Sequence, residues 1–188
     1  ARGLGFGLGP RLNASGRLET AQISLDLLTT RDNGQALQLA QELDSMNQIR
    51  RKDQNRIFEE ANLQVSKYTD DEVLVLSSKN WNHGIVGIVA AKILEAHQKP
   101  TFVLQEISDE TKGSARSFSD FSVGEAIKYS QTHIIKGGGH NLAAGVTLKT
   151  TKISEFRLSV NEYYKSLKLS DQKAHLLPKS DITLSNFD

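Results

Sequence analysis

The sequence predicts an α/β fold in which helices cover a sheet and one long helix precedes it. Two short runs, residues 73–76 and 101–104, are apolar at nearly every position, which is typical of strands buried on both faces. Residues 84–96 and 153–167 instead carry apolar residues at helical spacing. A further helical pattern, residues 35–67, lies ahead of them all. Strands that alternate with helices indicate a sheet covered by helices.

Composition limits the class of protein. The chain has 188 residues, of which 38% are hydrophobic, enough for one good domain and additional parts. Its formal net charge is +1, so any site for a polyanion must be a local cluster of charge. Cysteine is absent, which excludes disulfides and thiolate metal sites and leads us to expect a reducing, cytoplasmic location. No apolar run approaches the roughly 18 residues of a membrane span, so we expect no membrane partner.

Residues 1–17 are rich in glycine and include a proline, which argues against a regular element there. Arg11, Asn13 and Arg17 lie among these glycines. Two arginines and an amide suit contacts with phosphate or carboxylate groups, and an arginine-rich hinge between domains is the alternative. The chain begins without methionine inside this run, which suggests a piece of a longer protein. Residues 18–30 then predict a helix of about three turns.

A long helix is predicted over residues 35–67. Asp32 can cap its start, with Gln35 as the second partner of a capping box. A helix of that length spans roughly 50 Å at about 1.5 Å per residue. Its two apolar stripes lie on either side of residues 50–56, which offer little to bury. We interpret the helix as a connector whose charged middle crosses open space or a groove, and an ordinary solvated helix face is the alternative.

Residues 112–117 form the first candidate binding segment. If this segment is a strand, the period of two places Lys112, Ser114 and Arg116 on one face and only small residues on the other. Such a row of donors suits a chain of phosphates. The alternative is an exposed edge strand that its charges protect from pairing with other chains.

Residues 136–140 form the second candidate segment. A strand over residues 132–136 would lead into three glycines, and turned backbone N–H groups in such a run can form an anion-binding concavity. Lys136 and His140 would flank that concavity with further donors. A tight turn followed by a helix start is the alternative, because short glycine motifs occur often by chance.

The remaining segments complete the predicted sheet and its cover. Ser122 is expected to cap a short helix over residues 123–129. After the glycines we expect a tight bend at residues 142–145 and a strand at 146–148. Thr151 is expected to cap the last helix.

Four motifs resemble segments of the RecJ-type single-strand-specific DNA exonucleases, and they occur in order with plausible spacings. The motifs are Gly9-Pro10-Arg11-Leu12-Asn13-Ala14-Ser15-Gly16-Arg17-Leu18, Trp81-Asn82-His83-Gly84-Ile85-Val86-Gly87-Ile88-Val89-Ala90, Lys112-Gly113-Ser114-Ala115-Arg116-Ser117 and Gly138-Gly139-His140-Asn141-Leu142-Ala143-Ala144-Gly145. Four ordered motifs are far more specific than any one of them. The resemblance covers residues 5–165 in rough outline.

The resemblance implies a fold and a division into domains. The family has a DHH phosphoesterase domain, a long connecting helix, a DHHA1 domain and often an OB-like domain. We therefore expect a DHHA1-type mixed sheet flanked by helices and preceded by the long connecting helix. Residues 1–17 would be the C-terminal edge of a missing catalytic domain, and 18–68 the helical connector. Residues 69–168 would be the DHHA1 nucleic-acid-binding domain, and 169–188 the start of a truncated OB-like domain.

The resemblance also implies an activity, that of a metal-dependent 5′→3′ exonuclease that degrades single-stranded DNA in DNA repair and recombination. The ligands of its Mn²⁺ or Mg²⁺ would lie in the DHH domain, and this chain has no Asp-His-His sequence. Two-metal hydrolysis needs several hard ligands around ions about 3.5–4 Å apart. We therefore expect no catalytic residue and no metal ligand in this chain, and no hydrolysis of DNA by the chain alone.

The nucleic-acid contacts that the family implies are donors and glycines. In the sheet domain they fall at Ser114, Arg116, Gly138, Gly139 and His140, and Lys112 continues the same row. At the cleft that faces the catalytic domain they fall at Arg11, Asn13 and Arg17. These residue types suit phosphates rather than base edges, so binding would be neutral to sequence. Where the family often has histidine after the tryptophan, this chain has Asn82.

Two other functions compete with this interpretation. A nucleic-acid-binding module like the DHHA1-like tail of alanyl-tRNA synthetases would prefer RNA and would not explain the motif at residues 9–18. A related DHH phosphoesterase for very short oligonucleotides would not prefer long strands. For the exonuclease we expect single-stranded DNA as the partner, and we leave a single-strand-binding protein and a helicase open.

Overall fold

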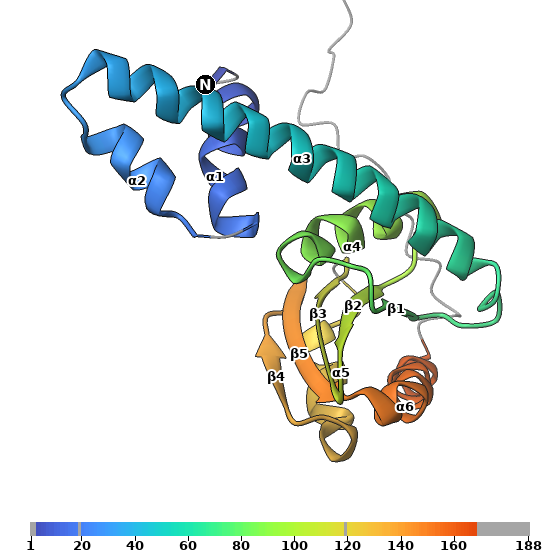
Figure 1. Ribbon diagram of the computed structural model, residues 1–188. Helices are drawn as coiled ribbons and strands as arrows, with labels where there is room; N and C mark the ends of the chain where they lie inside the picture. The colour runs from blue at the N-terminus through green and yellow to red at the C-terminus, as the bar shows by residue number, and fades with distance from the viewer. Residues whose placement is uncertain (1–2, 19, 119, 169–188) are drawn as a thin grey trace, which may run out of the picture.

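The computed structural model describes residues 3–18, 20–118 and 120–168 (Figure 1). Its elements, in chain order, are η1 (Gly3–Leu8), α1 (Gly9–Leu18), α2 (Gln22–Thr29), α3 (Asn33–Val65), β1 (Leu74–Ser78), α4 (His83–His97), β2 (Thr101–Ile107), β3 (Glu110–Arg116), α5 (Val123–Tyr129), η2 (Gln131–His133), β4 (Lys136–Gly139), β5 (Ala143–Lys149), η3 (Thr150–Lys152) and α6 (Ile153–Ser166). Helices α1, α2 and α3 form an N-terminal helical part, and the sheet domain follows it. This arrangement confirms the predicted α/β class with flanking helices and a long helix ahead of the sheet. None of the described helices is both long and apolar enough to cross a membrane.

The glycine-rich start of the chain is helical, so the predicted loop over residues 1–17 is wrong for the residues described. A π-helical turn, η1, leads directly into α1. Tertiary contacts here outweigh the low helix propensity of glycine. The hydroxyls of Ser15 and Ser24 share a buried hydrogen bond of 2.8 Å that joins α1 to α2. Arg11 joins α1 to α3 through an ion pair with Asp44.

Helix α3 begins and ends close to the predicted residues 35–67. Asp32 caps its start as predicted, because its Oδ1 accepts a hydrogen bond of 2.8 Å from the backbone N–H of Gln35. Helix α2, which precedes α3, is shorter than the helix predicted over residues 18–30.

The buried side of α3 is one continuous stripe, apolar at both ends and polar in the middle. Its members are Leu43, Met46, Asn47, Arg50, Gln54, Ile57 and Ala61. The helical period places these positions on one face, which contacts α1 in the first half of the helix and α4 in the second. The charged middle was expected to cross open space or a groove. Arg50 and Gln54 are instead buried in the helix contacts, whereas Arg51 and Lys52 are exposed.

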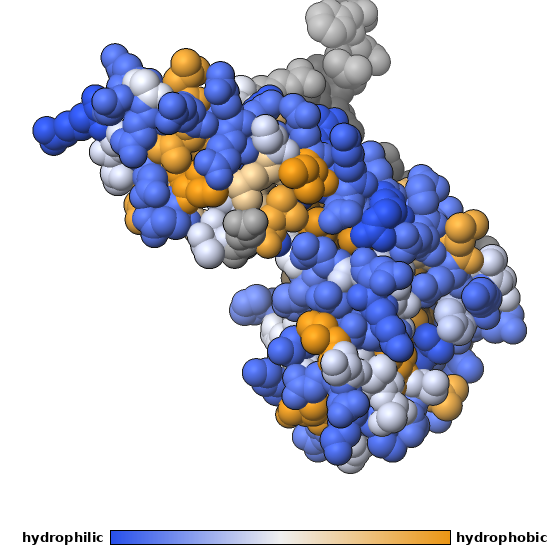
Figure 2. All heavy atoms as spheres, in the orientation of Figure 1, coloured by the Kyte–Doolittle hydropathy of each residue, from blue (hydrophilic) through white to orange (hydrophobic). Residues whose placement is uncertain are grey.

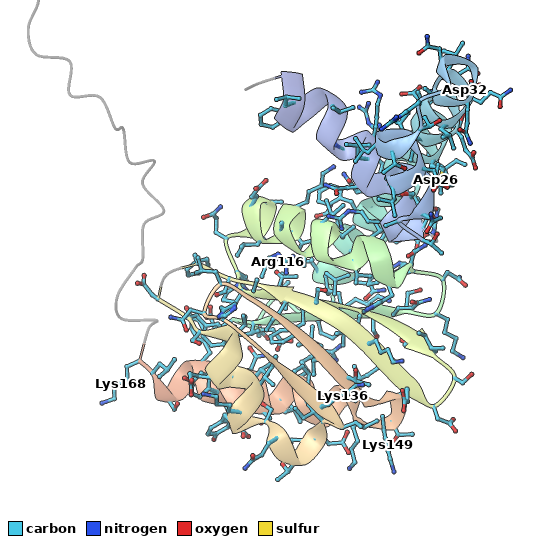
Figure 3. All side chains as sticks on the ribbon, turned by 90° about the vertical axis from the view of Figure 1, so that its left-hand side faces the viewer. Asp26, Asp32, Arg116, Lys136, Lys149 and Lys168 are labelled. Carbon is cyan, nitrogen blue, oxygen red and sulfur yellow. The ribbon has the colours of Figure 1, made fainter. Side chains whose placement is uncertain are left out.

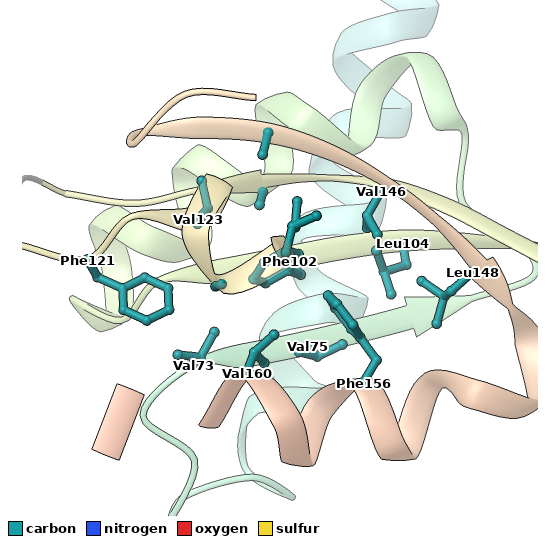
Figure 4. Close-up of a cluster of buried hydrophobic side chains, with 14 residues drawn as sticks. Val73, Val75, Phe102, Leu104, Phe121, Val123, Val146, Leu148, Phe156 and Val160 are labelled. Carbon is teal, nitrogen blue, oxygen red and sulfur yellow. The ribbon is translucent and has the colours of Figure 1, made fainter. Parts of the chain in front are cut away.

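The sheet has five strands in the order β1-β2-β3-β5-β4. Strands β1 and β2 are parallel, and the other neighbours are antiparallel, so the sheet is mixed as expected. Helix α4 lies over β2 and β3 on one face, where Trp81 and Ile85 belong to the core that α3 completes. Helices α5 and α6 cover the other face (Figure 4). There the rings of Phe102 and Phe156 meet edge to face, with 5.2 Å between centroids.

The glycine run forms the edge strand β4, not a turn after a strand. Residues 136–139 pair with β5, and β5 begins at Ala143. The predicted strand over 132–136 and the predicted bend at 142–145 are therefore wrong in position. Glycine is depleted in strands, but here the pairing with β5 overrides that preference.

Two helix caps were predicted in this region, and one is confirmed. Ser122 caps α5, because its hydroxyl accepts a hydrogen bond from the backbone N–H of Glu125. Thr151 does not cap α6. It lies in η3, and the residue before α6 is Lys152, which makes no side-chain cap. Residues 169–188, which were expected to begin an OB-like domain, lie outside the described residues.

Apolar side chains are exposed on the N-terminal helical part, where Figure 2 shows patches of hydrophobic surface. Leu4, Phe6 and Leu28 are 66%, 83% and 67% exposed. Most of the visible surface of the sheet domain is hydrophilic (Figure 2). The polar face of the sheet domain is therefore the first place to look for a nucleic-acid site.

Candidate nucleic-acid interface

The two faces of β3 carry different side chains. Thr111, Gly113 and Ala115 point toward the core under α5 and α6, and Lys112, Ser114 and Arg116 point to the side of α4. Helix α4 approaches this row at Gly87. An added Cβ there would lie 3.2 Å from Nη2 of Arg116 and 3.3 Å from Oγ of Ser114. A glycine in α4 therefore leaves room for the arginine and serine beneath it.

The strand register extends the row across the sheet, because residues directly opposite in a ladder share a face. One rung consists of Lys112, Thr147 and Lys136, and the next of Ser114, Gly145 and Gly138. Lysines thus lie at both ends of one rung, and the neighbouring rung is nearly bare backbone. We call Gly138 and Gly145 the glycine floor.

The glycines of this region differ in what they do. Gly139 belongs to the packed side, since an added Cβ would lie 2.5 Å from Cα of Ala144. Gly138 would meet nothing within 4 Å, and the nearest atom to a Cβ on Gly145 is 3.8 Å away. Close packing therefore explains Gly139. The φ of Gly138 is +159°, which L side chains rarely adopt, so its backbone also favours glycine. Neither reason applies to Gly145, and together the two glycines leave the sheet open to a ligand.

A cleft of about 520 Å³ opens over this part of the sheet. It is lined by His83, Lys112, Gly113, Lys136, Gly137, Gly145, Val146 and Thr147. The sequence assigned no binding role to His83, Gly145 or Thr147. The signal that reveals them is the pairing of β4 with β5, which the sequence does not show.

Arg116 lies beneath α4, whereas Lys136 lies farther along the sheet (Figure 3). Nη1 of Arg116 donates a hydrogen bond of 2.7 Å to the carbonyl of Ala115. Partial burial lowers the pKa of Arg116, and the positive charge of Arg17 lowers it further. Arginine nevertheless stays charged at neutral pH. Among the described side chains no carboxylate forms an ion pair with Arg116, so its charge is available to an anion.

The three N-terminal candidates differ in position. Arg17 reaches the sheet domain, where its Nη1 donates a hydrogen bond of 3.1 Å to the carbonyl of Gly84 in the first turn of α4. Gly84 permits this approach, because a Cβ there would collide with the carbonyl of Arg17. Asn13 lines a cleft of about 360 Å³ together with Arg17. Arg11 instead is held against α3 by Asp44.

His140 lies in the turn between β4 and β5. Its backbone N–H donates a hydrogen bond of 2.8 Å to the carbonyl of Ala143, and its side chain is exposed. Ala143 lies opposite Arg116 in the ladder, so the turn is at the arginine end of the row. The neighbouring Asn141 fastens the turn to α5 by accepting a hydrogen bond of 3.1 Å from the hydroxyl of Ser122.

Taken together, the candidates form a basic surface with an open backbone floor. Along β3, Lys112 and Arg116 are separated by about 13 Å at roughly 3.3 Å per residue. Charged donors at that spacing on both sides of bare backbone can hold the phosphates of an extended strand. No base-reading side chain is needed for this arrangement.

The described residues do not fit a metal centre. They contain no group of three or more histidine, aspartate or glutamate side chains that could hold an ion. A hydrolytic step through Mg²⁺ or Mn²⁺ therefore cannot be assigned to these residues.

Fold and site together define the class of protein. Residues 70–166, just over half of the chain, match the model of the DHHA1 domain. The chain belongs to the DHHA1 domain family. The matched residues contain the whole sheet, the donor row of β3 and the glycine floor.

Among curated proteins the chain is similar to the single-stranded-DNA-specific exonuclease RecJ. It is 38% identical to RecJ of Bacillus subtilis (strain 168) over 162 residues, which cover 85% of this chain and 21% of the relative. It is 36% identical to RecJ of Escherichia coli (strain K12) over 172 residues, which cover 86% of this chain and 30% of the relative. The chain thus spans less than a third of the length of these relatives.

Solved structures give the same result. RecJ from Thermus thermophilus in complex with Mn²⁺ matches with a TM-score of 0.80 and 30% identity, over 87% of this chain and 24% of that one. The complex of the same protein with Mg²⁺ matches with a TM-score of 0.79, over 26% of its chain. The predicted resemblance to RecJ-type exonucleases is confirmed by these matches.

Proposed function

We propose that this chain is the part of a metal-dependent 5′→3′ single-stranded DNA exonuclease that holds the sugar–phosphate backbone of the substrate. The observation that carries the proposal is the donor row Lys112–Ser114–Arg116 beside a glycine floor that packing does not require. The relatives named RecJ supply the substrate, single-stranded DNA, and the reaction, exonucleolytic hydrolysis. The whole enzyme would act in DNA repair and recombination.

The chemistry of the surface favours a single strand without sequence preference. Phosphate contacts fix position and orientation but do not distinguish bases. Aromatic residues make up only 6% of the chain, so we expect base stacking to contribute little to the affinity for the strand. A strand that enters from the side of Arg17 would pass Arg116 and His140, cross the glycine floor and reach Lys112 and Lys136.

The proposal assigns different tasks to the candidate residues. Lys112, Ser114, Arg116, Gly138 and His140 would contact the strand, and Gly139 would shape the edge strand that carries them. Asn13 and Arg17 would border the path toward the catalytic part of the enzyme, and Arg11 would hold α1 against α3. On the same proposal residues 1–17 are the C-terminal edge of a DHH catalytic domain and residues 18–68 are the helical connector. Residues 69–168 are the DHHA1 nucleic-acid-binding domain, and residues 169–188 begin an OB-like domain.

The test is equilibrium binding of labelled single-stranded DNA, duplex DNA and RNA of equal length to the 188-residue chain at two salt concentrations. We expect preference for single-stranded DNA and a steep loss of affinity with salt. Arg116→Ala should weaken binding about tenfold to a hundredfold, because a charge-assisted hydrogen bond contributes about 1.5–3 kcal/mol. The slope of log K against log salt should fall by about 0.7 for one lost contact to a single strand.

The matched control is Lys128→Ala, which removes one positive charge from α5 on the opposite side of the sheet. Its affinity should equal that of the unmodified chain. Tighter binding of RNA than of DNA would favour the RNA-binding alternative. If Arg116→Ala and Lys128→Ala lose the same amount of DNA affinity, the loss reflects net charge and not a contact at Arg116.

Hydrolysis is expected to need residues that this chain does not supply. The purified chain, incubated with Mn²⁺ or Mg²⁺ and single-stranded DNA, should release no nucleotides. Metal-dependent turnover by the pure chain would contradict this division of labour. The proposal places the enzyme in the cytoplasm, where a single-strand-binding protein or a helicase would work on the same substrate.

A further inference from the structure

Thr147 is a buried threonine whose hydroxyl makes no hydrogen bond within the described part of the chain. The residue is 7% exposed, and it lines the cleft of about 520 Å³ over the sheet. Its neighbours Val146 and Leu148 belong to the apolar core on the other face, so strand alternation directs Thr147 to the side of the cleft. Valine would fill the same space without a polar group. A buried hydroxyl that faces a cleft without a partner therefore indicates a ligand.

Two lysines flank this hydroxyl on the same rung of the sheet. Lys112 of β3 and Lys136 of β4 lie directly opposite Thr147, one on either side. Neighbouring strands are about 4.8 Å apart, so the backbones of the two lysines are about 10 Å apart with Thr147 midway. Lysine carries its charge on a flexible stem of four carbons, so both ammonium groups can reach a ligand bound above Thr147.

The charges of both lysines are available to an anion. Lys136 forms no ion pair with a carboxylate of the described residues. Nζ of Lys112 lies 3.7 Å from Oε2 of Glu110, and both side chains of this pair are exposed. Such a surface pair contributes little, so Glu110 does not compete strongly with a bound anion. An anion placed between the lysines would also relieve their mutual repulsion.

His83 adds a flat ring to the same cleft. Its backbone N–H donates a hydrogen bond of 3.0 Å to Oε1 of Gln105, which lies opposite Lys112 in the ladder. The start of α4 is therefore fixed to the rung that carries the two lysines. The imidazole is exposed, and rings of this kind stack on nucleobases. Between the ring and the lysines, the bare backbone of Gly137 and Gly145 leaves room for a ligand.

We infer that this cleft binds a free nucleoside 5′-monophosphate, the class of product that exonucleolytic hydrolysis releases. Lys112, Thr147 and Lys136 hold its phosphate monoester. The backbone at Gly145 admits the sugar, and the ring of His83 stacks on the base. The volume of the cleft lies within the range of pockets for small ligands, about 300–1,000 Å³.

The charge of the ligand favours a free nucleotide over an internal part of a strand. A phosphate monoester carries a charge of about −1.5 to −2 at pH 7, whereas each phosphodiester of a strand carries a single charge. Two lysines around one hydroxyl therefore match a monoester better. The inference rests on the proposed function and adds a regulation to it, because Lys112 and Lys136 are also the far end of the proposed path of the strand. A bound product would compete with the strand there.

The experiment measures the dissociation constant of thymidine 5′-monophosphate for the 188-residue chain by isothermal titration calorimetry at constant ionic strength. Inorganic phosphate and thymidine are titrated separately as the two parts of the ligand. The nucleotide should bind more tightly than either part, because it joins the contacts of both in one molecule.

Variants of Thr147 separate the hydroxyl from the shape of the side chain. Thr147→Val keeps the shape and removes the hydroxyl, so nucleotide affinity should fall about tenfold, as for other hydrogen bonds to charged groups. Thr147→Ser keeps the hydroxyl and should retain most of the affinity. Lys128→Ala, on α5 beyond the other face of the sheet, is the control for net charge and should bind like the unmodified chain. Melting temperatures show that each variant is folded.

Equal nucleotide affinity in the unmodified chain and Thr147→Val would overturn the inference. So would inorganic phosphate that binds as tightly as the nucleotide, or no nucleotide binding at millimolar concentration. Single-stranded DNA binding by the same proteins tests the proposed function separately. If the nucleotide binds through Thr147 and DNA does not bind, the cleft is a nucleotide site and the proposed function fails. If DNA binds and the nucleotide does not, only this inference fails.

Discussion

The two faces of the sheet domain are built from the same strands, but helices close one of them almost completely and leave part of the other open. On the side of α5 and α6, alternate residues of β2, β3 and β5 pack into a closed apolar core that includes Phe102, Leu148 and Phe156. On the other side, α3 and α4 close a second apolar core over β1 and β2, which includes Trp81 and Ile85, and the intervening residues of β3, β5 and β4 present donors and bare backbone. The first face is therefore apolar across the sheet, whereas the second combines an apolar core with the proposed ligand-binding surface.

Glycine shows the difference most directly, because it occurs on both faces for opposite reasons. On the packed face a Cβ on Gly113 would collide with the carbonyl of Val103 and lie 2.7 Å from Cα of Leu104. On the open face a Cβ on Gly145 would meet no atom closer than the carbonyl oxygen of Gly113, at 3.8 Å. The same residue type therefore serves close packing on one face and access to the backbone on the other.

The largest expected effect breaks the packed face. Phe102→Ala removes a fully buried ring that packs edge to face on Phe156. The free energy of unfolding should fall by about 3–5 kcal/mol, as for other buried aromatic residues. Urea unfolding followed by circular dichroism measures it. A loss below about 1 kcal/mol would mean that the packing of Phe102 in this core contributes little to stability.

The next prediction compares Gly113 on the packed face with Gly145 on the open face. Gly113→Ala should destabilise the protein by about 1–3 kcal/mol through overpacking, with little change in DNA affinity of the folded molecules. Gly145→Ala should change stability by less than about 0.5 kcal/mol and weaken single-stranded DNA binding about tenfold, which is about 1.4 kcal/mol. Thermal melts and binding titrations of both variants check this pair. If Gly145→Ala binds single-stranded DNA as tightly as the unmodified chain, the glycine floor is not part of the binding surface.

The smallest expected effect concerns the far end of the open face. Lys136→Ala removes a lysine that lines the cleft over the floor. A single phosphate contact should be lost, so the salt slope should fall by about 0.7 and affinity at moderate salt severalfold. Lys128→Ala, on α5, is the control for net charge. If the salt slope of Lys136→Ala equals that of the unmodified chain, the bound strand does not reach Lys136.

Sequence reasoning succeeded where local rules decide the structure. The period of two placed Lys112, Ser114 and Arg116 on one face because alternation is a property of the strand itself. Asp32 and Ser122 were correct as caps because a side chain that accepts a backbone N–H bond is a local device. The long helix α3 followed from its helical pattern.

The errors arose where distant contacts override local preference. Glycine-rich residues 9–18 are helical because α2 and α3 hold α1 in place. The glycines of β4 are extended because β5 pairs with them. Arg50 was predicted to lie in a solvated stretch, but it is buried. Composition cannot show which face of a helix is covered by a neighbouring helix. The glycine floor and its cleft could not be predicted for the same reason, since Gly145 and Gly138 become neighbours only through the pairing.

The most direct test of the central claim is to map where a single strand lies on the molecule. Backbone amide NMR shifts of the isotope-labelled chain would be followed during titration with a short oligothymidylate. The account predicts changes at Ser114, Gly138 and Gly145 on the open face and at Arg17 near α4, with α5 and α6 unaffected. Changes confined to α5 and α6, or no changes on β3, β4 and β5, would contradict it.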